Sequence, residues 1–113
     1  MIEVVEYLDP AERSPFGRWV GSLDRTARVE VLVALARMEQ GNLSNVKPVG
    51  GGVAEYRIHF GPGYRLYFGQ EGNTLIVLVA GGTKKRQQQD IATAKARWAD
   101  YRKRKQARTP AWR

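Results

Sequence analysis

The sequence contains no cysteine and only one histidine, His59, among its 113 residues. Without cysteine the chain can form neither a disulfide framework nor a thiolate metal site, and a single imidazole makes a zinc centre improbable. No apolar run approaches the ~20 residues that cross a bilayer. The first ten residues, MIEVVEYLDP, lack the basic and then apolar order of a signal peptide. These absences predict a soluble, cytoplasmic protein that uses no metal or other cofactor and does not contact membranes.

The chain has the composition of an ordinary globular domain. Hydrophobic residues make up 42% of it and charged residues 27%, and 113 residues suffice for one core. The last eight residues include a proline and show no periodicity. We therefore predict one domain over residues 1–105, followed by a basic, disordered tail over residues 106–113.

The net charge of +8 is concentrated at one end of the chain. Residues 1–83 hold 8 Lys/Arg against 9 Asp/Glu, whereas residues 84–113 hold 11 against 2. Such clustering favours nucleic-acid binding, because neutralised phosphates release condensed counterions. The alternative is a solvated basic helix that only keeps the protein soluble.

The first half of the chain predicts a strand and then two helices. Residues 2–7 are rich in β-branched and aromatic side chains, which is typical of a strand. A helix can begin at Asp9-Pro10 or at Ser14-Pro15, and a second helix can run from a cap at Asp24 to about residue 40. Apolar residues recur at helical spacing in both, so the two should form an αα-hairpin with one side to bury.

After Gly41 the apolar period changes from about 3.6 residues to 2. Strands are expected over residues 46–50, 53–60, 64–68 and 74–80, and Gly81-Gly82 should end the last of them. Thr83 can then cap a basic helix that ends near residue 105. The order β-α-α-β-β-β-β-α predicts an α+β protein, with a mostly antiparallel sheet, the αα-hairpin packed on it and a basic C-terminal helix.

The strands at 53–60 and 64–68 predict a hairpin with two different faces. A three-residue loop, Gly61-Pro62-Gly63, would pair Phe60 with Tyr64. That register sets Arg57 opposite Tyr67 and His59 opposite Arg65. One face is then apolar, and the other carries Glu55, Arg57, His59, Arg65 and Tyr67.

This polar face, beside Lys84-Lys85-Arg86, suits a phosphodiester. Guanidinium groups bind phosphate oxygens bidentately and stabilise the charge of a five-coordinate transition state. Tyr67 and His59 could stack on a base or exchange a proton with a ribose hydroxyl. RNA can be cut without metal because its own 2′-OH is the nucleophile. The alternative is that the arginines are solvent-facing residues paired with Glu55, and that Tyr67 only packs across the strands.

The stretch from NVKPVGGG to ARWADY resembles the addiction-module killer proteins, a HigB-like branch of the RelE/ParE toxins. The likeness rests on the ordered runs VKPV, RI-F-GPGYR-YF and GG-K-Q-DI-A and covers about residues 2–105. It implies a small α+β toxin. RelE-type members cut messenger RNA in the ribosomal A site, whereas ParE-type members inhibit DNA gyrase. It also implies a cognate antitoxin, usually a helix-turn-helix protein from the adjacent gene.

The resemblance also implies roles for individual residues. Arg57 and Arg65 match the family's basic sheet residues, and Tyr67 matches its sheet tyrosine. A lysine-glutamine-aspartate signature at the last helix matches Lys84, Gln88 and Asp90. The chain departs from the pattern at His59, where the family often has aspartate.

Together these observations predict a type II toxin that acts as a ribosome-dependent mRNA endonuclease. The alternatives are a non-enzymatic gyrase inhibitor and an inactive nucleic-acid-binding member of the fold. The predicted catalytic residues are Arg57, Arg65, Tyr67, Lys84 and His59. The predicted RNA-binding residues are Lys47, Lys85, Arg86, Gln88 and Arg102, with no metal ligand.

Overall fold

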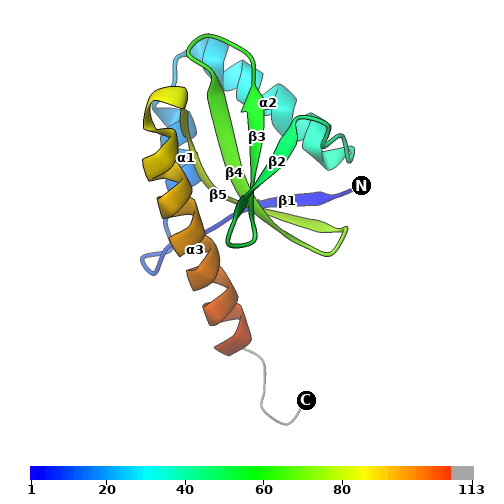
Figure 1. Ribbon diagram of the computed structural model, residues 1–113, viewed down its shortest axis with the longest axis vertical. Coiled ribbons are helices and arrows are strands. Elements are labelled where there is room, and N and C mark those ends of the chain that lie inside the picture. The colour runs from blue at the N-terminus through cyan, green and yellow to red at the C-terminus, as the bar shows by residue number, and fades with distance from the viewer. Residues whose placement is uncertain (108–113) are drawn as a thin grey trace.

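The structure is a computed structural model, and it describes residues 1–107. The strands and helices follow one another in the predicted order (Figure 1). They are β1 (Glu3–Glu6), α1 (Pro15–Gly21), α2 (Arg25–Glu39), β2 (Val46–Gly50), β3 (Val53–Ile58), β4 (Tyr64–Glu71), β5 (Leu75–Thr83), the short 3-10 helix η1 (Lys84–Arg86) and α3 (Gln87–Ala107).

The five strands form one sheet in the order β1-β5-β4-β3-β2. β1 pairs with β5 in parallel, and the other three pairings are antiparallel. Helices α1 and α2 pack on one face of the sheet, and α3 runs along the other (Figure 1). The predicted α+β class is confirmed, including the αα-hairpin and the C-terminal helix.

Both N-terminal helices begin at a side-chain cap. Ser14 Oγ accepts a hydrogen bond from Gly17 N at 2.9 Å, and Pro15 occupies the first helical position. Asp24 Oδ1 accepts from Ala27 N at 2.8 Å and caps α2. Of the two possible starts for the first helix, the chain uses Ser14-Pro15. Asp9 instead holds a turn, because its Oδ1 accepts from two backbone amides, at residues 11 and 13.

The sheet separates two hydrophobic cores. On one face, the apolar side of the β3–β4 hairpin packs against the apolar stripes of α1 and α2. On the other face, α3 covers the sheet with Ala94 and Trp98, which are buried, and with Ile91 and Tyr101 at their edge. These four residues recur at helical spacing in the sequence.

The predicted register of the β3–β4 hairpin is wrong by two residues. Arg57 lies opposite Arg65 rather than Tyr67, and Ile58 pairs with Tyr64. The reason lies in the turn: Phe60 N donates to Ile58 O at 2.9 Å and Gly63 N donates to Phe60 O at 3.0 Å. His59 and Phe60 therefore belong to the turn and not to the strand. A shift by two residues leaves every side chain that remains in the two strands on its predicted face.

The boundaries after β4 also differ from the expectation. β5 continues through Gly81 and Gly82 to Thr83, and Thr83 forms no side-chain cap. η1 precedes α3, which runs on through Gln106 and Ala107. The predicted tail from residue 108 onward lies outside the described residues. None of the helices within residues 1–107 combines the length and apolarity needed to span a bilayer.

Candidate functional site

One buried carboxylate, that of Glu55 on β3, organises the polar side of the β3–β4 hairpin. Its side chain is 0% exposed. Glu55 Oε1 accepts a hydrogen bond from Arg57 Nε at 3.0 Å. Glu55 Oε2 accepts from Gln87 Nε2 at 2.8 Å and lies 3.6 Å from Arg65 Nε. A single acidic side chain thus holds two guanidinium groups and the first residue of α3.

The two arginines lie directly opposite each other on neighbouring strands. Like charges in that position repel, and the carboxylate of Glu55 offsets the repulsion. The side chain of Arg57 is 38% exposed, whereas that of Arg65 is 8% exposed. Arg65 Nη1 also donates to Gly63 O at 3.2 Å. Arg57 can therefore reach a ligand directly, while Arg65 supplies charge from beneath the surface.

The environment of Glu55 keeps its carboxyl ionised. Burial is the largest single influence and by itself raises the pKa of Glu55. Hydrogen bonds from Arg57 and Gln87, together with the charge of Arg65, outweigh it. The net effect holds the pKa of Glu55 below its ordinary value. A carboxylate engaged in this way orients its neighbours and has no free oxygen with which to take a proton from a substrate.

Tyr67 lies on the same face but under α3. Its side chain is 0% exposed and belongs to the core that contains Ala94 and Trp98. Burial, followed by the negative charge of Glu55, raises the pKa of Tyr67 well above its ordinary value. The predicted polar face is therefore largely covered. In this position Tyr67 cannot stack on a nucleotide base, because α3 occupies the space above it.

Two predicted lysines lie beside the arginine pair. Lys47 on β2 pairs directly with Glu55, which places the two side chains on one face of the sheet. Lys84 N donates to Gly63 O at 3.1 Å, the same carbonyl that accepts from Arg65. Both lysines are exposed. The structure thus gathers four basic residues around Glu55: Lys47, Arg57, Arg65 and Lys84.

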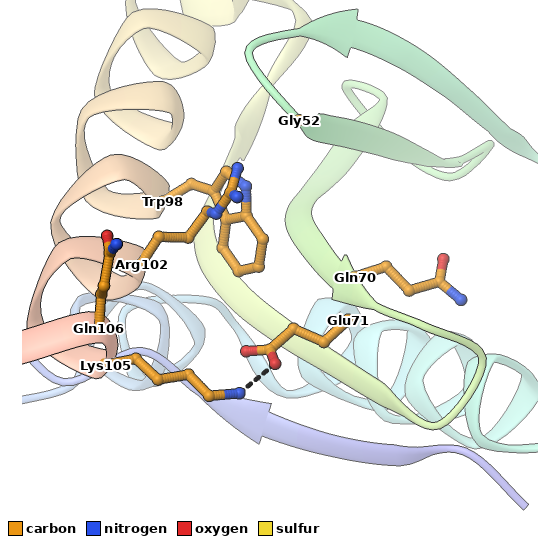
Figure 2. A pocket seen from close by; sticks show the side chains of 7 residues that line it. All are labelled: Gly52, Gln70, Glu71, Trp98, Arg102, Lys105 and Gln106. Carbon is orange, nitrogen blue, oxygen red and sulfur yellow. Dashed lines mark hydrogen bonds and ion pairs between the residues drawn. The ribbon is translucent and has the colours of Figure 1, made fainter. Parts of the chain in front are cut away.

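Other predicted RNA-binding residues spread along the start and the far end of α3. Lys85, Arg86 and Gln88 are exposed in η1 and the first turn of α3. Arg102 lies roughly 22 Å further along the helix axis than Gln87, at 1.5 Å per residue. There it lines a cavity of about 570 Å³ together with Trp98 and Glu71 (Figure 2). Arg102 is therefore not part of the arginine cluster.

His59 is exposed in the turn after β3, where it borders the same cavity as Arg57 of the cluster. This cavity, of about 160 Å³, is also lined by Glu30 and Arg37 of α2. Helix α2 covers the opposite face of the sheet from α3. The predicted pairing of His59 with Arg65 is wrong, because His59 has left the strand.

Sequence reasoning treated Glu55 only as a possible partner of the arginines and missed Gln87. A lone acid on the same hairpin face as two arginines is a usable signal for such a partner. Gln87 gives no comparable signal, because its contact depends on where α3 crosses the sheet. The glutamine that the family signature pointed to, Gln88, is exposed instead.

The cluster can hold an anion without help from a metal. Glu55 fixes the Nε side of Arg57, which leaves the two Nη groups as donors toward solvent. Lys47 and Lys84 add exposed basic side chains beside it. The chemistry of such a set suits a phosphodiester, because fixed positive charge stabilises added negative charge.

Residues 18–99 match the family described as phage-derived protein Gp49-like (DUF891). The chain is also 35% identical, over 81 residues, to an uncharacterized protein of Haemophilus influenzae, and the match covers 71% of this chain and 82% of that protein. The match to the family takes in most of the described chain, from α1 to α3. The chain therefore belongs to the Gp49-like family, which is a family of type II toxins with a RelE/ParE-like fold.

Proposed function

We propose that this toxin is a ribosome-dependent mRNA endonuclease that cuts without metal. The observation that carries the proposal is the basic cluster around Glu55, where Arg57 and Arg65 share one buried carboxylate beside two exposed lysines. A site that must stabilise a pentacoordinate phosphorus needs fixed positive charge more than it needs a large cavity. The cluster meets that requirement.

In this proposal the 2′-oxygen of the substrate attacks the adjacent phosphorus. A bond forms between the 2′-oxygen and phosphorus, and the bond from phosphorus to the 5′-oxygen breaks. The products are a 2′,3′-cyclic phosphate and a 5′-hydroxyl, so the proton lost by the 2′-OH is balanced by one gained by the leaving oxygen. No outside reactant enters the step.

The residues divide the work according to their exposure. Arg57 contacts the scissile phosphate, and Arg65 adds charge from below. Lys84 contacts the phosphate or takes part in proton transfer, and Lys47 binds the neighbouring backbone. Tyr67 acts as a positioning residue, because its buried ring supports the strand that carries Arg65. His59 lies in the turn after β3, borders the same cavity as Arg57, and contacts the RNA at the edge of the cluster.

The deciding experiment is induction of the chain without its antitoxin, followed within minutes by mapping of mRNA 5′ ends. We expect new ends inside translated messages, and we expect them to vanish when translation is blocked. Growth arrest with intact messages, DNA damage and filamentation would instead indicate a gyrase inhibitor. Folded protein that causes no arrest would indicate a member without toxicity.

The matched variants are Arg57→Ala and Arg25→Ala. Arg57 lies in the cluster, whereas Arg25 is an exposed arginine at the start of α2 on the other face. We expect Arg57→Ala to reduce cleavage by about a hundredfold, the size typical for loss of one charge-stabilising donor. Arg25→Ala should leave cleavage unchanged. Equal cleavage in both variants would exclude the cluster as the site.

Membership of a toxin family implies a cognate antitoxin as partner. We propose that it is a helix-turn-helix protein from the adjacent gene, and that messenger RNA and the ribosomal A site are the other partners.

A further inference from the structure

β5 lies between β4 and β1 in the sheet, and it extends several residues beyond the end of β1. Pairing with β1 ends at Glu6 and Leu78. Two further contacts close the ladder: Tyr7 N donates to Leu78 O at 2.9 Å, and Arg97 Nη1 donates to Val79 O at 2.8 Å. From Ala80 to Thr83 the strand pairs with β4 on one side, and nothing within residues 1–107 pairs with its other side. This open stretch is an unpaired strand edge.

The open edge forms the floor of a groove, which we call the β5 groove. Its cavity of about 430 Å³ lies between α1 and the beginning of α3. A second cavity of about 430 Å³ adjoins it and shares Pro15, Trp19 and Arg97. The first cavity is lined by residues 80–83 of the strand itself and by Pro15, Trp19, Arg86, Asp90 and Arg97.

The pair Gly81-Gly82 is explained by how closely the groove walls approach the strand. A Cβ atom on Gly81 would lie 2.1 Å from the Trp19 ring, and one on Gly82 would lie 1.9 Å from Asp90 Oδ2. No side chain fits at either position without moving a wall. The two glycines therefore let both walls lie directly against the faces of the strand, so that only its edge opens into the groove.

The groove is basic. Arg13 and Arg18 line the second cavity, Arg86 lines the first, and Arg97 lines both. None of these four arginines forms an ion pair within the described part of the chain. Two acids line the cavities: Asp9 accepts hydrogen bonds from the backbone of its own turn, and Asp90 lies near enough to Arg86 and Arg97 to interact with their charges. Four arginines against two acids leave the groove with a net positive charge, which favours an acidic occupant.

The other end of the sheet is protected from strand addition. β2 carries Pro48 and has an irregular register between Pro48 and Gly50. Proline and bulges are the usual devices that prevent pairing at an edge. The open stretch of β5 contains neither proline nor bulge beyond Ala80.

We infer that the β5 groove binds an extended, acidic segment of the cognate antitoxin, which adds a strand alongside Ala80–Thr83. Amide and carbonyl groups alternate along a strand edge, and a peptide backbone is the ligand that matches this alternation. RNA would use the arginines but would leave the edge unpaired. The inference needs the antitoxin that membership of the family implies, and it does not depend on RNA cleavage.

The first test is amide hydrogen exchange on the purified chain, alone and in complex with the antitoxin from the adjacent gene. The amides of Ala80–Thr83 that do not bond to β4 should exchange at least about tenfold more slowly in the complex. The edge of β2, over Val46–Gly50, should not change. Unchanged exchange at Ala80–Thr83 in a stable complex would overturn the inference. A short single-stranded RNA is the second ligand, and protection of this stretch by RNA alone would also overturn it.

The second test uses two matched charge reversals. Arg13→Glu with Arg18→Glu changes two exposed arginines of the groove. Arg25→Glu with Arg28→Glu makes the same change on α2. The groove pair should weaken antitoxin affinity by at least about tenfold, and the α2 pair should not. Circular dichroism verifies folding of both. Growth arrest without antitoxin should persist in the groove pair while neutralisation fails. Equal affinity of the two pairs would contradict the inference even if the toxin proved not to cut RNA.

Discussion

At the scale of single residues, the charge of Glu55 supports both arginines of the cluster. Glu55→Gln keeps the shape of the side chain but leaves Arg57 and Arg65 facing each other without a counter-ion. We expect the free energy of unfolding to fall by about 3 kcal/mol, the lower end for breaking a buried ion pair. Urea unfolding followed by tryptophan fluorescence measures it. The control is Glu71→Gln, whose partner Lys105 lies at the surface. Its loss should stay below about 1 kcal/mol, and equal losses would contradict the role of Glu55.

The stability difference between the natural chain and Glu55→Gln should also depend on pH. The pKa of Glu55 in the folded chain lies below its ordinary value of 4.5. A depressed carboxyl pKa adds stability above the ordinary value, and that stability is lost as the pH falls through the folded value. The difference between the natural chain and Glu55→Gln should therefore be full at neutral pH and shrink below about pH 4.5. A difference that stays constant down to pH 3 would indicate that packing, and not charge, is what the substitution removes.

At the scale of secondary-structure elements, α3 rests on the sheet through Trp98. A Cβ atom on Gly69 of β4 would lie 2.2 Å from the Trp98 ring. Gly69→Ala should therefore push the helix outward and cost about 2 kcal/mol of unfolding free energy. Gly21→Ala is the matched control, because Gly21 has no heavy atom within 4 Å of its ideal Cβ. It should be neutral or slightly stabilising in thermal melts. A stable Gly69→Ala chain would mean that α3 is not held at this contact.

The strands and their faces could be predicted from the period-2 pattern, but the register could not. Alternation fixes a register only up to shifts of two residues, since such shifts keep every side chain on its face. Whether Phe60 closes the strand or enters the turn therefore decides the pairing of Arg57. That choice depends on backbone bonds around Gly61 and Gly63, which have φ of 55° and 80°. The pattern of apolar residues does not predict these backbone bonds.

The pattern of residues also could not predict that α3 covers the polar face of the hairpin. A strand with charged residues on one side is typical of a solvated face, and Tyr67 and Glu55 are nevertheless fully buried. The sequence does predict the apolar stripe of α3, including Ala94 and Trp98. It does not say which face of the sheet receives that stripe, because this depends on the path of the chain after β5.

At the scale of the whole molecule, the basic residues of η1 and α3, within residues 84–107, lie on the side of the sheet that α3 covers. That side contains the cluster around Glu55 at the start of α3 and Arg102 toward its end. The opposite side carries α2, whose three arginines are largely offset by Glu30 and Glu39. A nucleic acid that approaches the molecule is therefore attracted to one side, and the attraction weakens as salt screens it.

That asymmetry gives a prediction for RNA binding by the intact chain. The logarithm of its affinity for a short single-stranded RNA should fall linearly with the logarithm of salt concentration, by about 0.7 for each phosphate contact. Lys47→Ala with Lys84→Ala removes two of the proposed contacts, so the slope should become shallower by about 1.4. Arg25→Ala with Arg28→Ala removes the same charge from α2 and should leave the slope unchanged. Fluorescence anisotropy over a salt series measures both. If the two pairs flatten the slope equally, the RNA is bound by the overall charge of the molecule and not by the cluster around Glu55.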